Sequence, residues 1–218
     1  MIHLFCGYEP RESIGFHVFV ASVIERASAP VNIIPLSAMS MPRGSNAFTV
    51  SRFLVPWLMQ FRGRAIFADA SDMLMLGDVA ELDALFDPDF AVQVVKHPTY
   101  LTRHKIKYRG TALETINTEY PRKDWASLML VNCEHPAWAG MTPPELVQRP
   151  MLDLLQLRHV PDEQIGALPD SWNRLVDEGH PTEGAQLMHW TAGIPGFEAY
   201  RDAPGSEAWH AARRAMEG

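Results

Sequence analysis

The sequence predicts an α/β fold, in which a mostly parallel sheet carries helices on both faces. Short apolar runs ended by glycine or polar residues alternate with segments whose apolar residues recur at helical spacing, and this alternation is typical of such sheets. The chain has 218 residues, of which 47% are hydrophobic and 21% charged. A chain of this length buries enough surface to fold without disulfides or metal, so we expect one domain over residues 1–218.

The elements follow from local patterns taken in order. The expected strands are residues 2–6, 31–36, 64–69, 90–95, 128–131 and 186–189. A helix is expected over residues 10–27, with Pro10 in its first turn. Residues 49–61 also look helical, but Pro56 predicts a kink or break there. Residues 98–123 are polar, basic and weakly periodic, which fits either a flap over a site or a plain loop.

Composition excludes several classes of function. The 19 basic and 26 acidic residues give a net charge of −7, which argues against binding along a nucleic-acid backbone. No apolar run reaches the roughly 20 residues that span a bilayer, and the first residues lack a charged leader and a cleavage site. Cys6 and Cys133 lie in apolar runs, as buried thiols of a reducing compartment do. We therefore expect a cytoplasmic protein without a transmembrane segment.

Polar residues at strand ends are the candidates for chemistry, because parallel sheets bind ligands beyond the carboxyl ends of their strands. Asp69 and Asp72 follow one apolar run directly, and His189 ends another. Two carboxylates and an imidazole suit Mn²⁺, and carboxylates alone suit Mg²⁺. The alternatives are that the aspartates cap the following turn and that His189 is structural.

Other catalytic signatures are missing from the sequence. It contains no Gly-x-Ser-x-Gly elbow, no Gly-x-Gly-x-x-Gly, no P-loop and no Cys-x-x-Cys pair. These absences argue against a serine hydrolase, a dinucleotide-dependent dehydrogenase, a P-loop NTPase and a structural zinc site.

Several segments, in this order along the chain, resemble those of family-8-type glycosyltransferases of the GT-A fold. In that family a strand ends in Asp-x-Asp and is followed by an apolar stretch, Gly-Asp-Ile and Glu-Leu. The similar segments here are residues 51–56, 63–82, 127–132, 168–173 (Leu-Pro-Asp-Ser-Trp-Asn) and 189–193 (His-Trp-Thr-Ala-Gly). Residues 120–127 are similar to the Tyr-Pro-Arg-Lys-Asn-Trp-Ser-Ser segment of bacterial glycosyltransferase-like proteins.

The resemblance implies a Rossmann-like GT-A domain that transfers a sugar from a nucleotide-sugar donor, with a UDP-sugar favoured, to a carbohydrate, lipid or protein acceptor, with retention of configuration. It implies that Asp69, Asp72 and His189 hold Mn²⁺ or Mg²⁺. Two departures stand out. Asp69-Ala-Ser-Asp72 is one residue longer than Asp-x-Asp, and the family's lysine after the histidine motif is missing. Lys96, Lys105 or Arg52 could replace that lysine beside the diphosphate.

The remaining site residues each have a functional and a structural interpretation. Tyr8 would contact the base or pack on the first helix, and Arg52 would bind sugar or phosphate or form a surface ion pair. Arg122 would meet a phosphate or an acceptor carboxylate, or stay solvated.

Asp162, Glu163 and Gln164 match the place where the family contacts the transferred sugar, and are the catalytic candidates; otherwise they are loop residues. Trp190 would line an acceptor groove or pack under the last helix, and Gly193 would let the backbone approach a ligand.

Two other functions stay open at this point. A metal-dependent phosphohydrolase would use the same aspartates to activate water, although the sequence shows no second dense cluster of carboxylates and histidines. A catalytically weak or inactive nucleotide-sugar-binding protein of the same fold would explain the lengthened acidic motif and the missing lysine.

Overall fold

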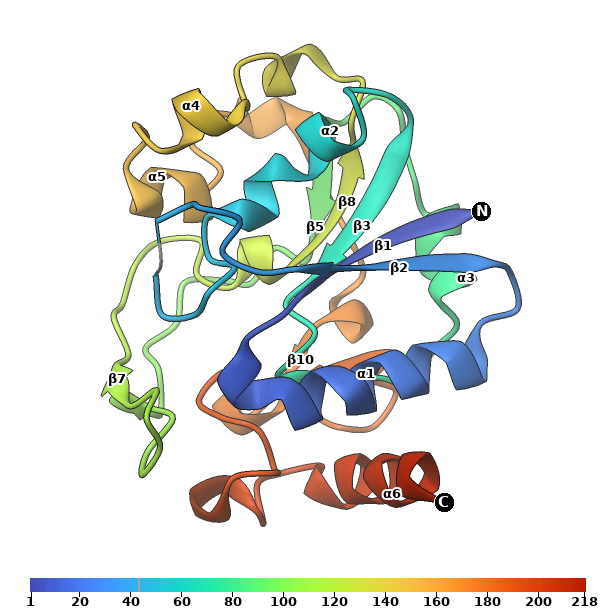
Figure 1. The fold of residues 1–218 in the computed structure, drawn as a ribbon, viewed down its shortest axis with the longest axis vertical. Helices are drawn as coiled ribbons and strands as arrows, with labels where there is room; N and C mark the ends of the chain where they lie inside the picture. Colours follow the sequence, from blue (N-terminus) through green and yellow to red (C-terminus); the bar gives the residue numbers. More distant parts are fainter. Residues whose placement is uncertain (43) are drawn as a thin grey trace.

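The computed structural model describes residues 1–42 and 44–218 (Figure 1). Its strands are β1 (Ile2–Gly7), β2 (Val31–Leu36), β3 (Arg64–Ala68), β4 (Met73–Met75), β5 (Val92–Val94), β6 (Ile106–Lys107), β7 (Thr115–Ile116), β8 (Leu128–Asn132), β9 (Ile165–Ala167), β10 (Arg174–Leu175) and β11 (Leu187–His189). Its α-helices are α1 (Ser13–Arg26), α2 (Val55–Leu58), α3 (Val79–Ala84), α4 (Pro143–Leu146), α5 (Met151–Leu155) and α6 (Ser206–Glu217).

The central sheet has six strands in the order β2-β1-β3-β8-β5-β9. The pairs β1–β2, β1–β3 and β5–β9 are parallel, whereas β8 runs antiparallel to both β3 and β5. The predicted class, a mostly parallel sheet with helices on both faces, is therefore confirmed. The carboxyl ends of β1 and β3 lie at one edge of this sheet, because the two strands pair in parallel from Leu4↔Ile66 to Cys6↔Ala68.

Alternating side chains of the strands feed two separate apolar layers. Phe5, Phe67 and Met129 point to one face and pack against α2, α4 and α5. Leu4, Ile66 and Leu130, each one position before or after these residues, point to the other face and pack against α1 and α3. This period of two is the pattern of a sheet buried on both faces. Figure 1 shows α2, α4 and α5 on one side of the sheet and α1 and α6 on the other.

A second, three-stranded sheet has the order β10-β11-β4. The strand expected over residues 186–189 forms as β11, but it pairs antiparallel with β4 and joins this smaller sheet instead of the central one. No strand was expected over Met73–Met75, because methionine and leucine favour helices over strands. Met73 and Met75 are fully buried. Helix α6 packs outside α1, and its Trp209 shares an apolar cluster with Trp190 and with Val18 of α1.

Residues 49–61 and 98–123 are the two segments that the sequence left open. Residues 49–61 form a 3₁₀-helix over Ser51–Leu54 that continues directly into one α-helical turn, α2, with Pro56 in its first turn. The helix therefore changes type just before Pro56 and does not break at this proline. Residues 98–123 carry the short hairpin β6–β7 and are tied to the rest of the chain. The Thr102 hydroxyl donates to Glu178, and the Tyr108 amide donates to the carbonyl of Ala192 over 2.6 Å.

No helix in the described ranges is both long enough and apolar enough to cross a membrane.

Candidate functional site

A tight turn after β3 brings the two aspartates of the acidic motif together. Ala70 adopts a left-handed conformation with φ of +60°, which costs a non-glycine residue about 1–2 kcal/mol. The Ser71 amide donates to the carbonyl of Asp69 and the Met73 amide to that of Ala70. The Ser71 hydroxyl donates to the carbonyl of Gly7 at the end of β1. The turn therefore accommodates the two residues between Asp69 and Asp72, one more than in Asp-x-Asp, and still brings the two aspartates together.

His189 completes the cluster from the second sheet. It ends β11 opposite Met73 of β4, and the Trp190 amide donates to the carbonyl of Asp72. One side-chain ligand atom from each of Asp69, Asp72 and His189 lies within 4.8 Å of the others. The three side chains are all buried. Within residues 1–42 and 44–218 no other group of three or more histidines, cysteines or acidic residues meets this condition.

Asn173 fixes the orientation of the imidazole. Its amide nitrogen donates to the Ser127 hydroxyl over 2.9 Å, so its Oδ1 faces His189 and accepts from Nδ1, 3.0 Å away. The proton is thereby held on Nδ1, and Nε2 points toward Asp72 Oδ2 at 3.5 Å. Histidines that bind a metal through one ring nitrogen typically donate a hydrogen bond from the other one. Asn173 lies in the Leu-Pro-Asp-Ser-Trp-Asn segment, but no role for it was predicted.

Arg52 is a buried partner of the cluster. Its Nη1 lies 2.6 Å from Asp69 Oδ1 and donates to the carbonyl of Ala126, while its Nε donates to that of Thr49. The guanidinium also lies over the rings of Phe48 and Phe67. Arg52 does form an ion pair, but a buried one, and not the helix-surface pair that was its structural interpretation. One positive charge is thus fixed beside Asp69.

The charges of the cluster shift one another's titration. Burial raises the pKa of Asp69 to about 7, and Arg52 acts in the opposite direction without cancelling this effect. Burial also penalises the charged form of His189, but the carboxylate of Asp72 outweighs it and raises the pKa of His189 to about 9. For Asp72 burial is again opposed by His189, and its pKa is lowered.

The donor set fits a divalent cation. Asp72 Oδ1 is buried without a hydrogen-bond partner, and Asp69 Oδ1 meets Arg52 without an aligned hydrogen bond. Buried carboxylate oxygens are normally paired, so unpaired ones mark a place for a cation. Two carboxylates and one imidazole suit Mn²⁺ better than Mg²⁺, which prefers oxygen ligands.

The cluster lines a central cavity of about 50 Å³. This volume holds an ion and a few waters, and it is far below the roughly 300–1,000 Å³ of cavities that enclose whole small molecules. Sequence reasoning missed several residues of its lining: Ser45, Asn46, Thr49, Lys107, Tyr108, Tyr120, Asp124, Ala126, Ser127 and Leu155. Lys107 places a cation beside the acidic cluster. The only sequence signal for it was the basic character of residues 98–123.

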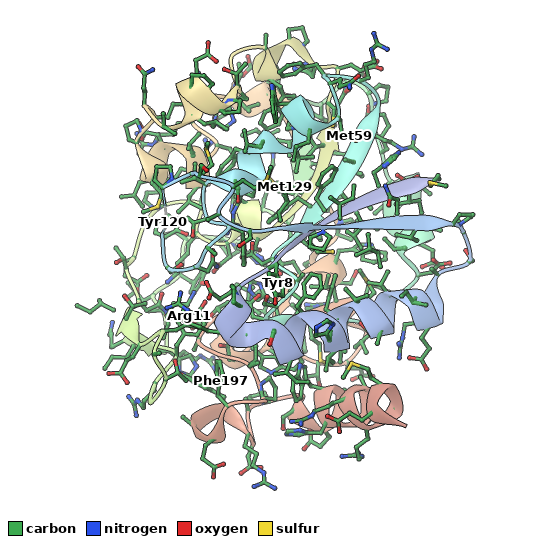
Figure 2. All side chains as sticks on the ribbon, in the orientation of Figure 1. Tyr8, Arg11, Met59, Tyr120, Met129 and Phe197 are labelled. Carbon is green, nitrogen blue, oxygen red and sulfur yellow. The ribbon has the colours of Figure 1, made fainter. Side chains whose placement is uncertain are left out.

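The other predicted cations and Tyr8 lie outside this cavity. Lys96 is exposed, with its ammonium 5.9 Å from the centre of the Trp125 ring. Lys105 is also exposed and lines a different cavity. Tyr8 is half-buried and packs edge-on against Phe16 of α1, with ring centres 5.1 Å apart. Figure 2 shows Tyr8 between the central strands and α1.

Arg122 and the three catalytic candidates do not line the central cavity either. Arg122 is half-buried against Trp125 and forms a 2.6 Å ion pair with Asp162. Asp162, Glu163 and Gln164 form a single 3₁₀ turn at the amino end of β9, and both acidic side chains are exposed. The structure therefore joins Asp162 to Arg122 but does not bring these three residues to the acidic cluster.

Trp190 and Gly193 lie in the loop after β11. Trp190 is fully buried, and its indole donates to the carbonyl of Pro204. Gly193 lies under the ring of Tyr200, where a Cβ would come within 2.5 Å of that ring. Both residues therefore pack the C-terminal segment. Neither lines the central cavity.

No protein-family model matches the chain. One curated relative, Protein CDI of Arabidopsis thaliana, is 34% identical over 224 residues, which cover 94% of this chain and 83% of the relative. The chain belongs to the family of Protein CDI. The name of this relative states no activity.

Solved structures share the fold. The bifunctional glycosyltransferase WbbM aligns with a TM-score of 0.68 and 13% identity over 97% of this chain. The galactosyltransferase LgtC, in complex with donor and acceptor sugar analogues, aligns with a TM-score of 0.62 and 13% identity over the whole chain and 97% of its own length. GlyE of Streptococcus pneumoniae TIGR4 aligns with a TM-score of 0.65 and 12% identity. The chain spans 49% of WbbM and 61% of GlyE. The fold is that of GT-A glycosyltransferases, as the sequence resemblance implied.

Proposed function

We propose that this protein is a metal-dependent glycosyltransferase that uses a nucleoside diphosphate sugar as donor, with a UDP-sugar favoured and retention of configuration. The observation that carries this proposal is the buried Asp69–Asp72–His189 cluster with its unpaired carboxylate oxygen, at the carboxyl edge of a GT-A sheet. In open α/β sheets this edge is where ligands bind.

Asp69, Asp72 and His189 would hold the cation, and Asn173 would keep Nε2 of His189 free for it. The bound ion, Mn²⁺ in preference to Mg²⁺, would act as a Lewis acid that neutralises the charge of the departing diphosphate. Lys107 lines the same cavity and would supply the positive charge that the family's missing lysine provides elsewhere. Arg52 would favour the ionised form of Asp69 and hold its side chain in place.

The transfer itself requires little protein chemistry. The acceptor hydroxyl oxygen forms a bond to the anomeric carbon, the bond from that carbon to the diphosphate oxygen breaks, and the hydroxyl proton passes to the leaving nucleoside diphosphate. Positioning and charge stabilisation carry such a reaction. Because the cavity holds only about 50 Å³, the nucleotide and sugar would lie outside it, with the diphosphate reaching toward the cluster.

A second candidate is a nucleotide-sugar-binding protein that has lost activity. Arg52 pairs with Asp69, and His189 with Asp72, so a positive group lies beside each carboxylate, as a cluster that works without a cation would require. A two-metal phosphohydrolase has less support, because the described part of the chain offers one cluster and not two.

The free, buried thiols of Cys6 and Cys133 fit our proposal that the protein works in the cytoplasm.

The test is calorimetric titration of UDP and GDP into metal-stripped protein, with and without Mn²⁺. We expect UDP to bind only with Mn²⁺ and the Asp72→Asn variant to lose this binding. Asp72 is the aspartate of the cluster whose pKa is lowered, and the substitution replaces its negative charge by a neutral amide. Asp83→Asn, which removes a surface partner of Arg64, is the matched control and should bind as the wild type does. Binding that ignores Mn²⁺ would favour the inactive binder, and binding of neither nucleotide would refute the proposal.

A further inference from the structure

A second cavity, of about 610 Å³, lies between residues 103–109 and residues 198–204. Residues 103–109 separate it from the central cavity, since Lys107 and Tyr108 line that one and their neighbours line this one. The two walls are joined where the Arg109 amide donates to the Tyr200 hydroxyl over 2.9 Å. The volume falls in the range of cavities that bind small molecules. Figure 1 shows the β6–β7 hairpin beside the turn that precedes α6.

Four basic side chains surround this cavity, those of Arg103, Lys105, Arg109 and Arg201. All four are exposed, and none forms an ion pair with a residue in the described ranges. The chain as a whole carries a net charge of −7. These four cations outnumber the three carboxylates of the lining, Asp177, Glu198 and Asp202, so the cavity attracts anions although the chain as a whole is acidic. Guanidinium groups in particular match the oxygens of phosphate and carboxylate groups.

The other lining groups match a carbohydrate. Glu198 and Asp202 lie in the same wall and offer acceptors for sugar hydroxyls. Tyr200, Ala203 and Pro204 add apolar surface for the face of a ring. Asp177 is occupied elsewhere, because it accepts from the Ala192 amide over 2.8 Å. The lining therefore combines cations for one anionic group with acceptors and apolar surface for a saccharide.

We propose that this second cavity binds a saccharide carrying a phosphate or carboxylate group. This binding rests on the cavity itself and not on the proposed transferase function, because residues 103–109 lie between the cavity and the acidic cluster. The loop from Thr191 to Gly193, which follows the cluster residue His189, links the two sites: Asp177 holds its backbone from the second cavity and Tyr200 covers Gly193.

The test is to titrate glucose 6-phosphate, glucuronate, glucose and inorganic phosphate separately into the wild-type chain and to measure binding by calorimetry. We expect at least one of the two anionic sugars to bind about tenfold or more tightly than glucose, because charge-assisted hydrogen bonds add to those of the hydroxyls. Comparison of glucose 6-phosphate with glucuronate shows which anionic group the site takes. Equal affinity for charged and neutral sugars would overturn the proposal, as would inorganic phosphate binding as tightly as glucose 6-phosphate.

The double variant Arg109→Gln/Arg201→Gln locates the binding. It should weaken binding of the anionic sugar about 10- to 100-fold, whereas Arg62→Gln/Arg158→Gln, two exposed arginines outside the cavity, should leave it unchanged. Undiminished binding by the first variant would refute this site.

Mn²⁺-dependent UDP binding, measured on the same proteins, separates the two proposals. It should persist in Arg109→Gln/Arg201→Gln, because neither residue lines the central cavity. If the wild type binds the anionic sugar but no UDP, the transferase function fails, while the saccharide site stands. If it binds UDP but no anionic sugar, only the second cavity's assignment fails.

Discussion

His189 is buried and His159 is half-buried, yet their surroundings push them to opposite protonation states. His189 lies against Asp72, and its pKa rises to about 9. His159 packs edge-on against Phe53 and near Trp138 in the apolar layer beneath α2, α4 and α5, and burial lowers its pKa to about 4. Burial alone therefore leaves a histidine neutral and structural. The carboxylates that the turn after β3 brings to His189 are what make a site for a cation.

The largest effect should come from breaking that turn at Ala70. A β-branched residue tolerates the left-handed conformation poorly, and the position is fully buried. Ala70→Val should therefore lower the free energy of unfolding by about 3 kcal/mol, measured by urea denaturation, and weaken Mn²⁺ binding in the folded remainder. Ala70→Gly is the matched variant: it adopts this conformation without strain and should keep Mn²⁺ binding. Equal stability of the valine and alanine proteins would show that the turn is not strained.

His159, which lies in apolar surroundings, should make the folded protein less stable in acid. Neutral His159 has a pKa of about 4 when folded and about 6.5 when unfolded. Its contribution to stability is therefore fully present above pH 6.5 and is lost as the pH falls from 6.5 toward 4, by about 2–3 kcal/mol. Neither ring nitrogen has a hydrogen-bond partner, so His159→Phe should remove this loss without breaking a hydrogen bond.

Denaturation of the wild type, His159→Phe and the exposed control His17→Phe between pH 8 and 4 checks this expectation. A wild type and a His159→Phe protein that lose stability in parallel would contradict the assignment of the acid lability to this residue.

A smaller effect should follow from loosening His189 without touching the ligands. Asn173→Ala removes the acceptor for Nδ1, which should reduce Mn²⁺ affinity about 10- to 100-fold. Asn132→Ala, which removes an amide hydrogen bond to the carbonyl of Pro88 at the opposite end of the sheet, is the control. NMR of the neutral imidazole, recorded above its pKa of about 9, separates positioning from stability: the His189 tautomer should change only in Asn173→Ala. An unchanged tautomer with unchanged affinity would make Asn173 purely structural.

Short-range patterns predicted part of the fold and of the site. Apolar runs located five strands of the central sheet, and polar residues at strand ends identified Asp69, Asp72 and His189. Five strands were not expected: β6, β7 and β10 have two residues each, β9 contains a glycine, and the methionines and leucine of β4 favour helices over strands. Residues 186–189 were expected in the central sheet, but pairing partners are set by tertiary packing. The burial of Arg52 and the inward direction of Lys107 depend on contacts with distant segments, so charge patterning could not show them.

The metal site can be tested by titrating Mn²⁺ into metal-stripped protein and measuring the free ion by electron paramagnetic resonance. We expect one Mn²⁺ bound per chain, loss of that binding in Asp72→Asn and His189→Ala, and retention in Asp83→Asn. A wild type that leaves all Mn²⁺ free, or an Asp72→Asn protein that binds it as the wild type does, would contradict the assignment of this cluster as the metal site.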